Sequence, residues 1–146
     1  MTPADLRSRF RFVFRVEVRF RDLDALGHVN NAVFLTYMES ARIAYWMKVT
    51  GRTDLRTLDM ILARTEIDYR SPVSYGEGLE VGVRCLSMRR SSFVLEFAIW
   101  ERSSSRLVAE ARKVLVHYDY AAGESRPLPP ELRQKVLAQD PDVREE

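Results

Sequence analysis

The feature that most constrains the fold of this chain is one long helical segment that is apolar over most of its surface. Residues 32–49 contain neither glycine nor proline and are rich in Leu, Met, Ala and aromatic residues, a composition that favours a helix. Such a helix is about 27 Å long, and its apolar positions cover much more than one stripe. Gly51 marks its expected end. A helix of this kind has to be wrapped, so the rest of the chain must supply a layer that surrounds it.

Most of the remaining chain has the pattern of strands. Apolar and polar residues alternate with a period of two, which is typical of half-buried strands. The alternating segments cover residues 12–20, 60–69, 79–85, 93–99 and 107–120. In the last of them Val114, Val116, Tyr118 and Tyr120 share one face. A strand, a long helix and then antiparallel strands joined by short turns predict an α+β fold, in which one curved antiparallel sheet wraps around one central helix.

Turn residues indicate how the later segments connect. Pro72 and two nearby glycines separate the strands at 60–69 and 79–85, and we predict that these two strands form a hairpin. Three prolines precede a short amphipathic helix that we expect at residues 131–138. The charged residues 141–146 are expected to form a flexible tail.

Composition places the chain among globular proteins. Its 146 residues suit a single domain, 1–146, and fractions of 46% hydrophobic and 30% charged residues are ordinary for that class. No apolar run approaches the roughly 20 residues needed to cross a bilayer, so we expect no membrane segment. The first residues lack the apolar stretch of a secretory signal, and we therefore expect a cytoplasmic protein.

Charge and cysteine content argue against two further classes. The 23 basic and 21 acidic residues are interspersed, which argues against a nucleic-acid-binding surface. Arginine dominates the basic set, because Lys48, Lys113 and Lys135 are the only lysines. Cys85 is the single cysteine, so it cannot form an intramolecular disulfide and is expected to be a buried, inert thiol.

A single copy of this chain would cover its helix on one side only. Sheet edges and helix flanks left open in this way are natural pairing surfaces. We therefore expect a homodimer or a homotetramer.

The best candidate for a functional site is the polar segment at residues 22–31, between the first strand and the long helix. It supplies a carboxylate at Asp24, an imidazole at His28 and unpaired backbone N–H groups at the helix start, which favour developing negative charge. These are the parts that acyl transfer requires. A purely structural interpretation also stands: the acids order a turn, Gly27 permits a tight backbone and Asn30 caps the helix.

The sequence of residues 18–42 resembles the signature of the 4-hydroxybenzoyl-CoA thioesterase-like group of hotdog-fold acyl-CoA thioesterases. That signature combines Asp-x-Asp, Gly-His-x-Asn-Asn, an aromatic residue and a Glu-x-x-Arg pair, and the chain matches it in residues 22–31, Tyr37, Glu39 and Arg42. Residues 69–72, 76–81 and 90–93 also look familial, so the resemblance covers nearly the whole chain. One departure is Glu77, where related chains often carry Asp. The resemblance implies a hotdog fold and hydrolysis of an acyl-CoA thioester to coenzyme A and a carboxylic acid.

Residue by residue, the resemblance implies roles within the polar segment. Asp24 would be the nucleophile or the general base, and both mechanisms stay open because they use the same residue. The backbone amide of Asn31 would polarise the thioester carbonyl, and Gly27 would let the substrate approach. His28 would donate a hydrogen bond to the substrate or to Asp24, with fixing of the loop as the equal alternative, while Asp22 would be structural. A lone carboxylate can suffice, because a thiol with a pKa of about 8.5 leaves without general-acid help.

Further residues are expected to bind the substrate. An apolar acyl pocket, which would suit an aromatic or a medium-chain acyl group equally, would be lined by Phe34, Tyr37, Met38, Ile61 and Tyr69. Arg89 and Arg90 would grip the coenzyme A phosphates, as basic residues at this place do in related enzymes, with a solvated turn as the competing interpretation.

Glu39 is the alternative catalytic acid, because some hotdog thioesterases keep their acid on the helix. An ion pair between Glu39 and Arg42, three positions apart, is the structural interpretation that we prefer.

Two other functions stay open. A non-catalytic acyl-CoA binding or sensing module would have the same fold, since fold does not fix function. An acyl-thioester hydratase or dehydratase would need His28 as its base, but the His-Phe-Pro motif of the dehydratases is missing. Neither His28 nor His117 has a second ligand at metal spacing, so we expect no metal site, and with acyl-CoA as the substrate we expect no cofactor.

Overall fold

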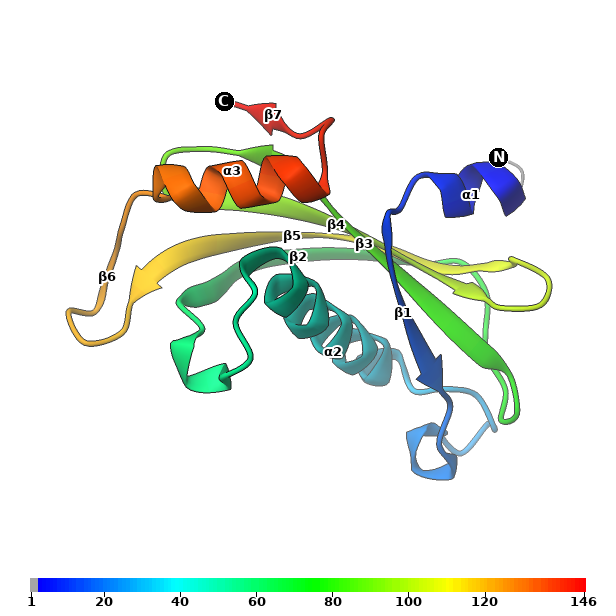
Figure 1. Cartoon of the computed structure of the whole chain (residues 1–146). Helices are drawn as coiled ribbons and strands as arrows, with labels where there is room; N and C mark the ends of the chain where they lie inside the picture. The colour runs from blue at the N-terminus through cyan, green and yellow to red at the C-terminus, as the bar shows by residue number, and fades with distance from the viewer. Residues whose placement is uncertain (1–2) are drawn as a thin grey trace.

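The computed structural model of the chain, which describes residues 3–146, is a curved antiparallel sheet folded around one long helix (Figure 1). The strands lie in the order β1-β3-β4-β5-β2, while β6 pairs with β5 and β7 pairs in parallel with β3. In chain order the elements are α1 (Pro3–Ser8), β1 (Phe12–Glu17), the 3-10 helix η1 (Phe20–Asp22), α2 (Asn31–Thr50), the 3-10 helix η2 (Leu55–Thr57), β2 (Met60–Tyr69), β3 (Gly78–Met88), β4 (Ser92–Glu101), β5 (Leu107–Asp119), β6 (Glu124–Ser125), α3 (Pro130–Gln139) and β7 (Arg144–Glu145). The predicted α+β fold, one curved sheet around one central helix, is confirmed.

The long helix α2 forms where the composition predicts it, and local signals set both of its ends. The Asn30 side chain caps the start by accepting a hydrogen bond from the Ala32 N–H at 2.9 Å. Gly51 ends the helix with a φ of 74°, a left-handed conformation that glycine adopts without strain, and its N–H donates to the Met47 carbonyl at 2.8 Å. Among residues 3–146, no helix is both long enough and apolar enough to span a membrane.

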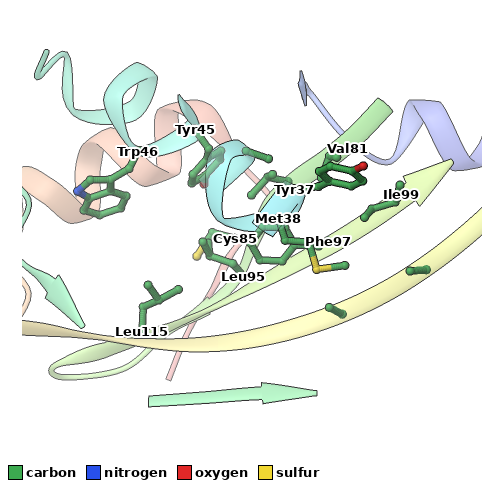
Figure 2. Close-up of a cluster of buried hydrophobic side chains, with 14 of the residues drawn as sticks. Tyr37, Met38, Tyr45, Trp46, Val81, Cys85, Leu95, Phe97, Ile99 and Leu115 are labelled. Atoms are coloured by element: carbon green, nitrogen blue, oxygen red, sulfur yellow. The ribbon is translucent and has the colours of Figure 1, made fainter. Parts of the chain in front are cut away.

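The main core lies between α2 and the inner face of the sheet. Met38, Ala41 and Tyr45 of the helix are fully buried, and the Trp46 ring stacks on the Phe93 ring with centroids 5.1 Å apart. Figure 2 shows the helix side chains Tyr37, Met38, Tyr45 and Trp46 together with the strand residues Val81, Cys85, Leu95, Phe97, Ile99 and Leu115. Burial of each large apolar side chain contributes about 1.5–3 kcal/mol, so the contact between α2 and the sheet strongly stabilises the fold.

One face of β5 forms the floor beneath α2. Its buried positions are Ala109, Ala111, Lys113 and Leu115, so the inner face of the strand is the opposite one from the face shared by Val114 and Val116. The two alanines leave room for the helix, and a lysine follows them on the same buried face.

The predicted hairpin between the strands at 60–69 and 79–85 is wrong. The strand β2 pairs with β5, and β3 pairs with β1 and β4, so the two supposed partners are separated by two other strands. Residues 70–77 therefore cross the end of the sheet instead of forming a tight turn. Alternation and turn residues specify that two strands exist, but they contain no information about which neighbour each strand pairs with.

The first strand is shorter than predicted. It ends at Glu17, and Phe20, which we expected to continue its inward face, is 79% exposed. The chain turns here because Asp22 accepts hydrogen bonds from the Arg19 N–H at 2.9 Å and from the Arg19 guanidinium at 3.1 Å, which closes η1. The alternation of apolar residues in the sequence continues past the end of the strand, so it gave no sign of this turn.

The C-terminal residues are not the flexible tail that we expected at 141–146. The side chain of Val143 is buried, β7 pairs with the end of β3, and the Glu146 N–H donates to the Met88 carbonyl at 2.8 Å. The buried carboxylate of Asp140 fixes this region, since it accepts hydrogen bonds from the Tyr45 hydroxyl at 2.5 Å and from the Cys85 N–H at 3.0 Å. The expected short helix before it is present as α3.

Candidate active site

The polar segment before α2 is organised by the buried carboxylate of Asp22. This side chain is only 2% exposed and accepts a hydrogen bond from the Tyr37 hydroxyl at 2.7 Å in addition to those from Arg19. Its own carbonyl accepts from the Asn30 N–H at 2.9 Å, which ties η1 to the start of α2. Burial by itself would raise the pKa of Asp22, but the hydrogen bonds from Tyr37 and Arg19 outweigh it and lower the pKa. Asp22 is therefore a structural anion that fixes the segment.

Asp24, by contrast, lies on an exposed loop. Its Oδ1 atom accepts hydrogen bonds from the Leu26 N–H at 2.9 Å and from the His28 N–H at 3.3 Å. No donor among residues 3–146 binds the second oxygen, Oδ2. The loop depends on Gly27, whose φ of 82° lies in the left-handed region that other residues rarely adopt. One carboxylate oxygen of Asp24 thus holds the loop, and the other is free to meet a substrate or a water molecule.

The start of α2 offers a second useful group. The Asn30 side chain accepts from the Ala32 N–H, and the Asn30 carbonyl accepts from the Val33 N–H at 2.9 Å. Within residues 3–146, nothing accepts a hydrogen bond from the Asn31 N–H. An unpaired N–H at a helix N-terminus, reinforced by the helix dipole, attracts negative charge.

These groups face one open cavity of about 310 Å³. Asp24, His28 and Asn31 line it, together with Val29, Phe34, Tyr69, Arg70, Ser71 and Pro72. The Tyr69 hydroxyl donates to the Asn31 carbonyl at 3.1 Å, so the end of β2 is joined to the start of α2 at the cavity. Five of the predicted catalytic and substrate-binding positions therefore meet here.

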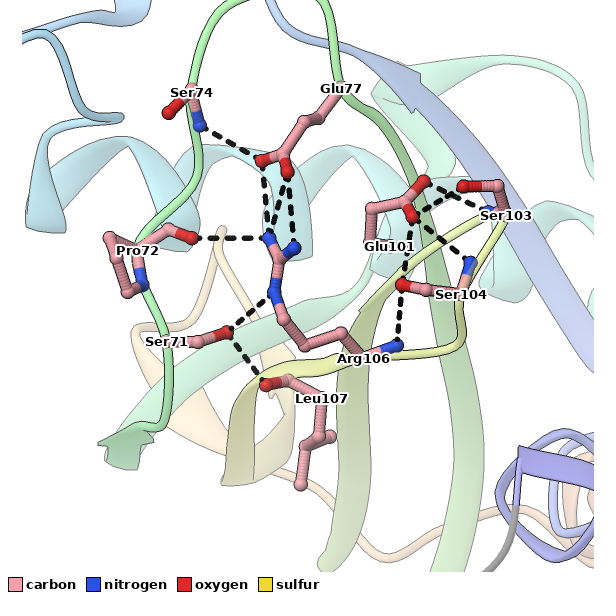
Figure 3. A network of polar contacts seen from close by, with 9 residues as sticks. All are labelled: Ser71, Pro72, Ser74, Glu77, Glu101, Ser103, Ser104, Arg106 and Leu107. Atoms are coloured by element: carbon pink, nitrogen blue, oxygen red, sulfur yellow. Dashed lines mark hydrogen bonds and ion pairs between the residues drawn. The ribbon is translucent and has the colours of Figure 1, made fainter.

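The loop at residues 70–77, which forms one side of the cavity, is held by Arg106 (Figure 3). Its guanidinium donates to the Pro72 carbonyl and to the Ser71 hydroxyl, both at 3.2 Å, and pairs with both Glu77 oxygens at 3.1 Å. Glu77 in turn accepts from the Ser74 N–H at 2.9 Å. The hydrogen bonds from Arg106 lower the pKa of Glu77, so this carboxylate is ionised at neutral pH. Glu77, which stands where related chains often carry Asp, thus pairs with Arg106, and this arginine fixes the loop.

Of the residues that the sequence predicts to bind the substrate, Gly27, Tyr37, Met38 and Ile61 do not line the cavity. Tyr37 lies in the core, where its hydroxyl bonds Asp22 and its ring meets the Phe34 ring edge-on with centroids 6.2 Å apart. Burial and Asp22 both raise the pKa of Tyr37. Tyr37 therefore holds Asp22 in place instead of lining the cavity. Gly27 likewise contributes through the loop conformation that it permits.

Arg89 and Arg90 lie far from the cavity within one chain. They occupy the turn between β3 and β4, next to Val116, whereas Tyr69 pairs with Ala109 near the start of β5. Between Ala109 and Val116 the strand runs for roughly 23 Å. Binding of coenzyme A phosphates by these arginines stays a prediction.

The alternative acid Glu39 is engaged by cations. The Arg42 guanidinium donates to both of its oxygens, as the spacing of three residues predicts, and the Lys113 ammonium lies 3.9 Å from its Oε2. It points to a different cavity from the one that Asp24 faces. Asp24 is therefore better placed than Glu39 to reach a group bound at the Asn31 N–H.

Sequence reasoning did not assign a site role to Arg70 and Ser71, which line the cavity after the end of β2. Arg70 pairs with Glu110 at 3.2 Å and is half-exposed. The signal in the sequence was the polar pair that directly follows an alternating strand, but nothing in it shows that this strand end meets the start of α2.

Taken together, the cavity presents a free carboxylate oxygen, an unpaired N–H at a helix N-terminus and an aromatic wall. A carbonyl oxygen bound at the Asn31 N–H would be polarised, because negative charge develops on that oxygen during attack. A carboxylate on the same cavity can attack the carbonyl carbon or take a proton from water. This arrangement suits cleavage of an activated acyl group.

Comparison with known proteins agrees with this chemistry. The family described as the thioesterase-like superfamily matches residues 18–136. The chain is 40% identical in sequence to a thioesterase of Thermus thermophilus whose crystal structure contains coenzyme A and Zn, with a TM-score of 0.83 over 91% of this chain and 96% of that one. Among residues 3–146, no group of three or more His, Cys, Asp or Glu side chains gathers that could hold a metal ion.

Two curated relatives are also similar. The chain is 25% identical over 127 residues to the long-chain acyl-CoA thioesterase FadM of Escherichia coli, which covers 84% of this chain and 94% of FadM. It is 30% identical over 97 residues to the uncharacterized protein YsmA of Bacillus subtilis. That match spans 66% of each of the two proteins.

Proposed function

Because the chain belongs to the thioesterase-like superfamily, we propose that it hydrolyses acyl-CoA thioesters to coenzyme A and a carboxylic acid at the cavity beside the start of α2. The observation that carries the proposal is that the free Oδ2 of Asp24 and the unpaired N–H of Asn31 line the same cavity. The likeness to a thioesterase that binds coenzyme A and to a long-chain acyl-CoA thioesterase supports this substrate class.

The proposed reaction begins with the thioester carbonyl oxygen at the Asn31 N–H. Asp24 then either attacks the carbonyl carbon, forming a mixed anhydride that water hydrolyses, or removes a proton from the water that attacks. In both routes the C–S bond breaks and coenzyme A leaves as a thiolate, which is stable enough to depart without a general acid. His28 lines the same cavity, where its imidazole can donate a hydrogen bond to the substrate.

The proposal includes an assembly of two or four copies. The strand β2 is an edge strand of the sheet, and its Ile61, Leu62 and Tyr69 side chains are 37%, 43% and 45% exposed. An apolar edge of this kind favours pairing with a second copy. A cytoplasmic location is also part of the proposal and agrees with the free, buried thiol of Cys85.

The test measures thiol release from a panel of aliphatic and aromatic acyl-CoA thioesters by the wild type and by Asp24→Asn. We expect hydrolysis to fall by at least about 100-fold in Asp24→Asn, as typical for loss of a catalytic base, while acyl-CoA affinity in calorimetry persists. Asp142→Asn is the matched control, because this exposed carboxylate lies in the C-terminal segment, outside the cavity.

Three results would contradict the proposal. Unchanged turnover in Asp24→Asn would move the catalytic role to Glu39. Acyl-CoA binding without thiol release by the wild type would instead indicate a sensing module, and hydration of an unsaturated acyl-CoA would indicate a hydratase.

A further inference from the structure

A lysine is buried between the sheet and the central helix, where a charged group is expensive. The side chain of Lys113 is only 2% exposed, on the inner face of β5 between Ala111 and Leu115. Removal of an ammonium group from water disfavours its charged form, and burial accordingly lowers the pKa of Lys113. A buried lysine of this kind needs a partner to stay charged.

The partners of Lys113 within the chain are incomplete. Its ammonium lies 3.9 Å from the Glu39 carboxylate and 5.2 Å from the centre of the Phe97 ring. Glu39, however, already accepts hydrogen bonds from Arg42. No residue between 3 and 146 accepts a hydrogen bond from the Lys113 ammonium. This cluster therefore has two cations for one anion, an excess of one positive charge.

The excess charge faces a cavity of about 290 Å³. Leu35, Thr36, Glu39, Leu62, Thr65 and Lys113 line it, between α2, β2 and β5. Apolar atoms make up most of the lining surface, and Lys113 and Glu39 supply its charged groups.

This second cavity lies on the same flank of α2 as the candidate active site. Phe34 lines the first cavity and Leu35 lines the second, while Tyr69 and Thr65 of β2 stand opposite them on one face of the strand. From Asn31, at the carbonyl site, to Glu39 the helix rises by about 12 Å. An acyl chain that starts at Asn31 and follows α2 would reach Lys113 with its far end.

Building on the proposed function, we propose that the second cavity receives the distal end of the acyl group and selects a medium-length chain that ends in a carboxylate. The apolar lining suits the methylene groups, and the terminal carboxylate would complete the pairing of the Lys113 ammonium. The substrate class is therefore the coenzyme A monothioesters of dicarboxylic acids. An acyl chain that ends in a methyl group would leave the buried ammonium without this partner.

The experiment compares two series of acyl-CoA thioesters of increasing length, one ending in a methyl group and one in a carboxylate. Thiol release gives kcat/KM for the wild type, for Lys113→Met, which keeps the length of the side chain without its charge, and for the exposed-lysine control Lys48→Met. Equilibrium binding of the same compounds to Asp24→Asn measures the preference without any hydrolysis.

We expect the wild type to favour the carboxylate-ended member by about 10- to 100-fold at the optimal length, in kcat/KM and in affinity, as one charge-assisted hydrogen bond in a buried site provides. Lys113→Met should abolish this preference, because kcat/KM and affinity should fall for the carboxylate-ended substrates and not for the methyl-ended ones. Lys48→Met should retain the preference.

Several outcomes would overturn the inference. One is a wild-type preference for methyl-ended chains at every length, which needs no variant to observe. Another is an unchanged preference for carboxylate-ended chains in Lys113→Met. If Lys113→Met changes only the oligomeric state of the protein, the cavity would instead be a contact surface for a second copy. Absence of thiol release from every compound would refute the proposed hydrolysis, while the binding series on Asp24→Asn would still decide whether the cavity selects a carboxylate.

Discussion

The hydrogen bond from Tyr37 to Asp22 should contribute to stability in a pH-dependent way, and Tyr37→Phe removes only that hydroxyl. The bond is 2.7 Å long and its acceptor is a carboxylate that is almost fully buried. Loss of a hydrogen bond to a buried charged group costs about 1.5–3 kcal/mol. With a urea dependence of about 2 kcal/mol per molar, the unfolding midpoint should fall by about 1 M. Tyr75→Phe is the control, because its ring is exposed and its hydroxyl donates to no residue among 3–146.

The pH dependence of this difference follows from the direction of the pKa shift. The pKa of Asp22 is lower in the folded protein than its ordinary value of 3.8. Its contribution to the free energy of unfolding is therefore complete above that ordinary value and is lost as the pH falls through the folded-state pKa. Without the hydroxyl of Tyr37 the folded-state pKa lies closer to the ordinary value, so the difference between variant and wild type should shrink on acidification. A difference below about 0.5 kcal/mol at neutral pH, or one that is constant with pH, would refute this reasoning.

Two other substitutions test the loop and the core. Arg106→Ala removes the bonds to Glu77, Ser71 and Pro72, so we expect KM for acyl-CoA to rise several-fold while the free energy of unfolding changes by only about 1 kcal/mol, because the pair is partly exposed. Steady-state kinetics with thermal unfolding checks this, and an unchanged KM would show that the loop needs no such support. Met38→Ala empties a fully buried position of α2 and should cost about 2–5 kcal/mol in denaturant unfolding. A loss below about 1 kcal/mol would mean that the core collapses into the space.

Local signals in the sequence were sufficient for the central helix and for the polar segment before it. The helix was expected over residues 32–49 and is found at Asn31–Thr50, because its caps at Asn30 and Gly51 are interactions between residues close in the chain. The turn at Asp24 and Gly27 is equally local. The sequence motif therefore identifies the segment that lines the cavity without any information on how the strands pair.

The pairing of strands could not be obtained in this way. Period-two alternation identified β2 and β3 as strands, but their adjacency in sequence suggested a hairpin, whereas β2 pairs with β5 at the far edge of the sheet. Alternation reports which side chains share a face, while the choice of partner depends on contacts between segments far apart in the chain. The same limitation hid the role of Arg106, which is distant in sequence from the loop that it fixes.

The sequence by itself determined the helix, the strands, the candidate acid at Asp24 and the family resemblance, because each of these depends on residue types at short, fixed spacings. Only the tertiary structure decided that Tyr69 closes the cavity at Asn31 and that Lys113 lies in the core beside Glu39. In the sequence Lys113 has the pattern of an ordinary strand lysine. Its burial results from the curvature of the sheet around α2, which brings the inner face of β5 under a helix that ends 57 residues before the strand begins.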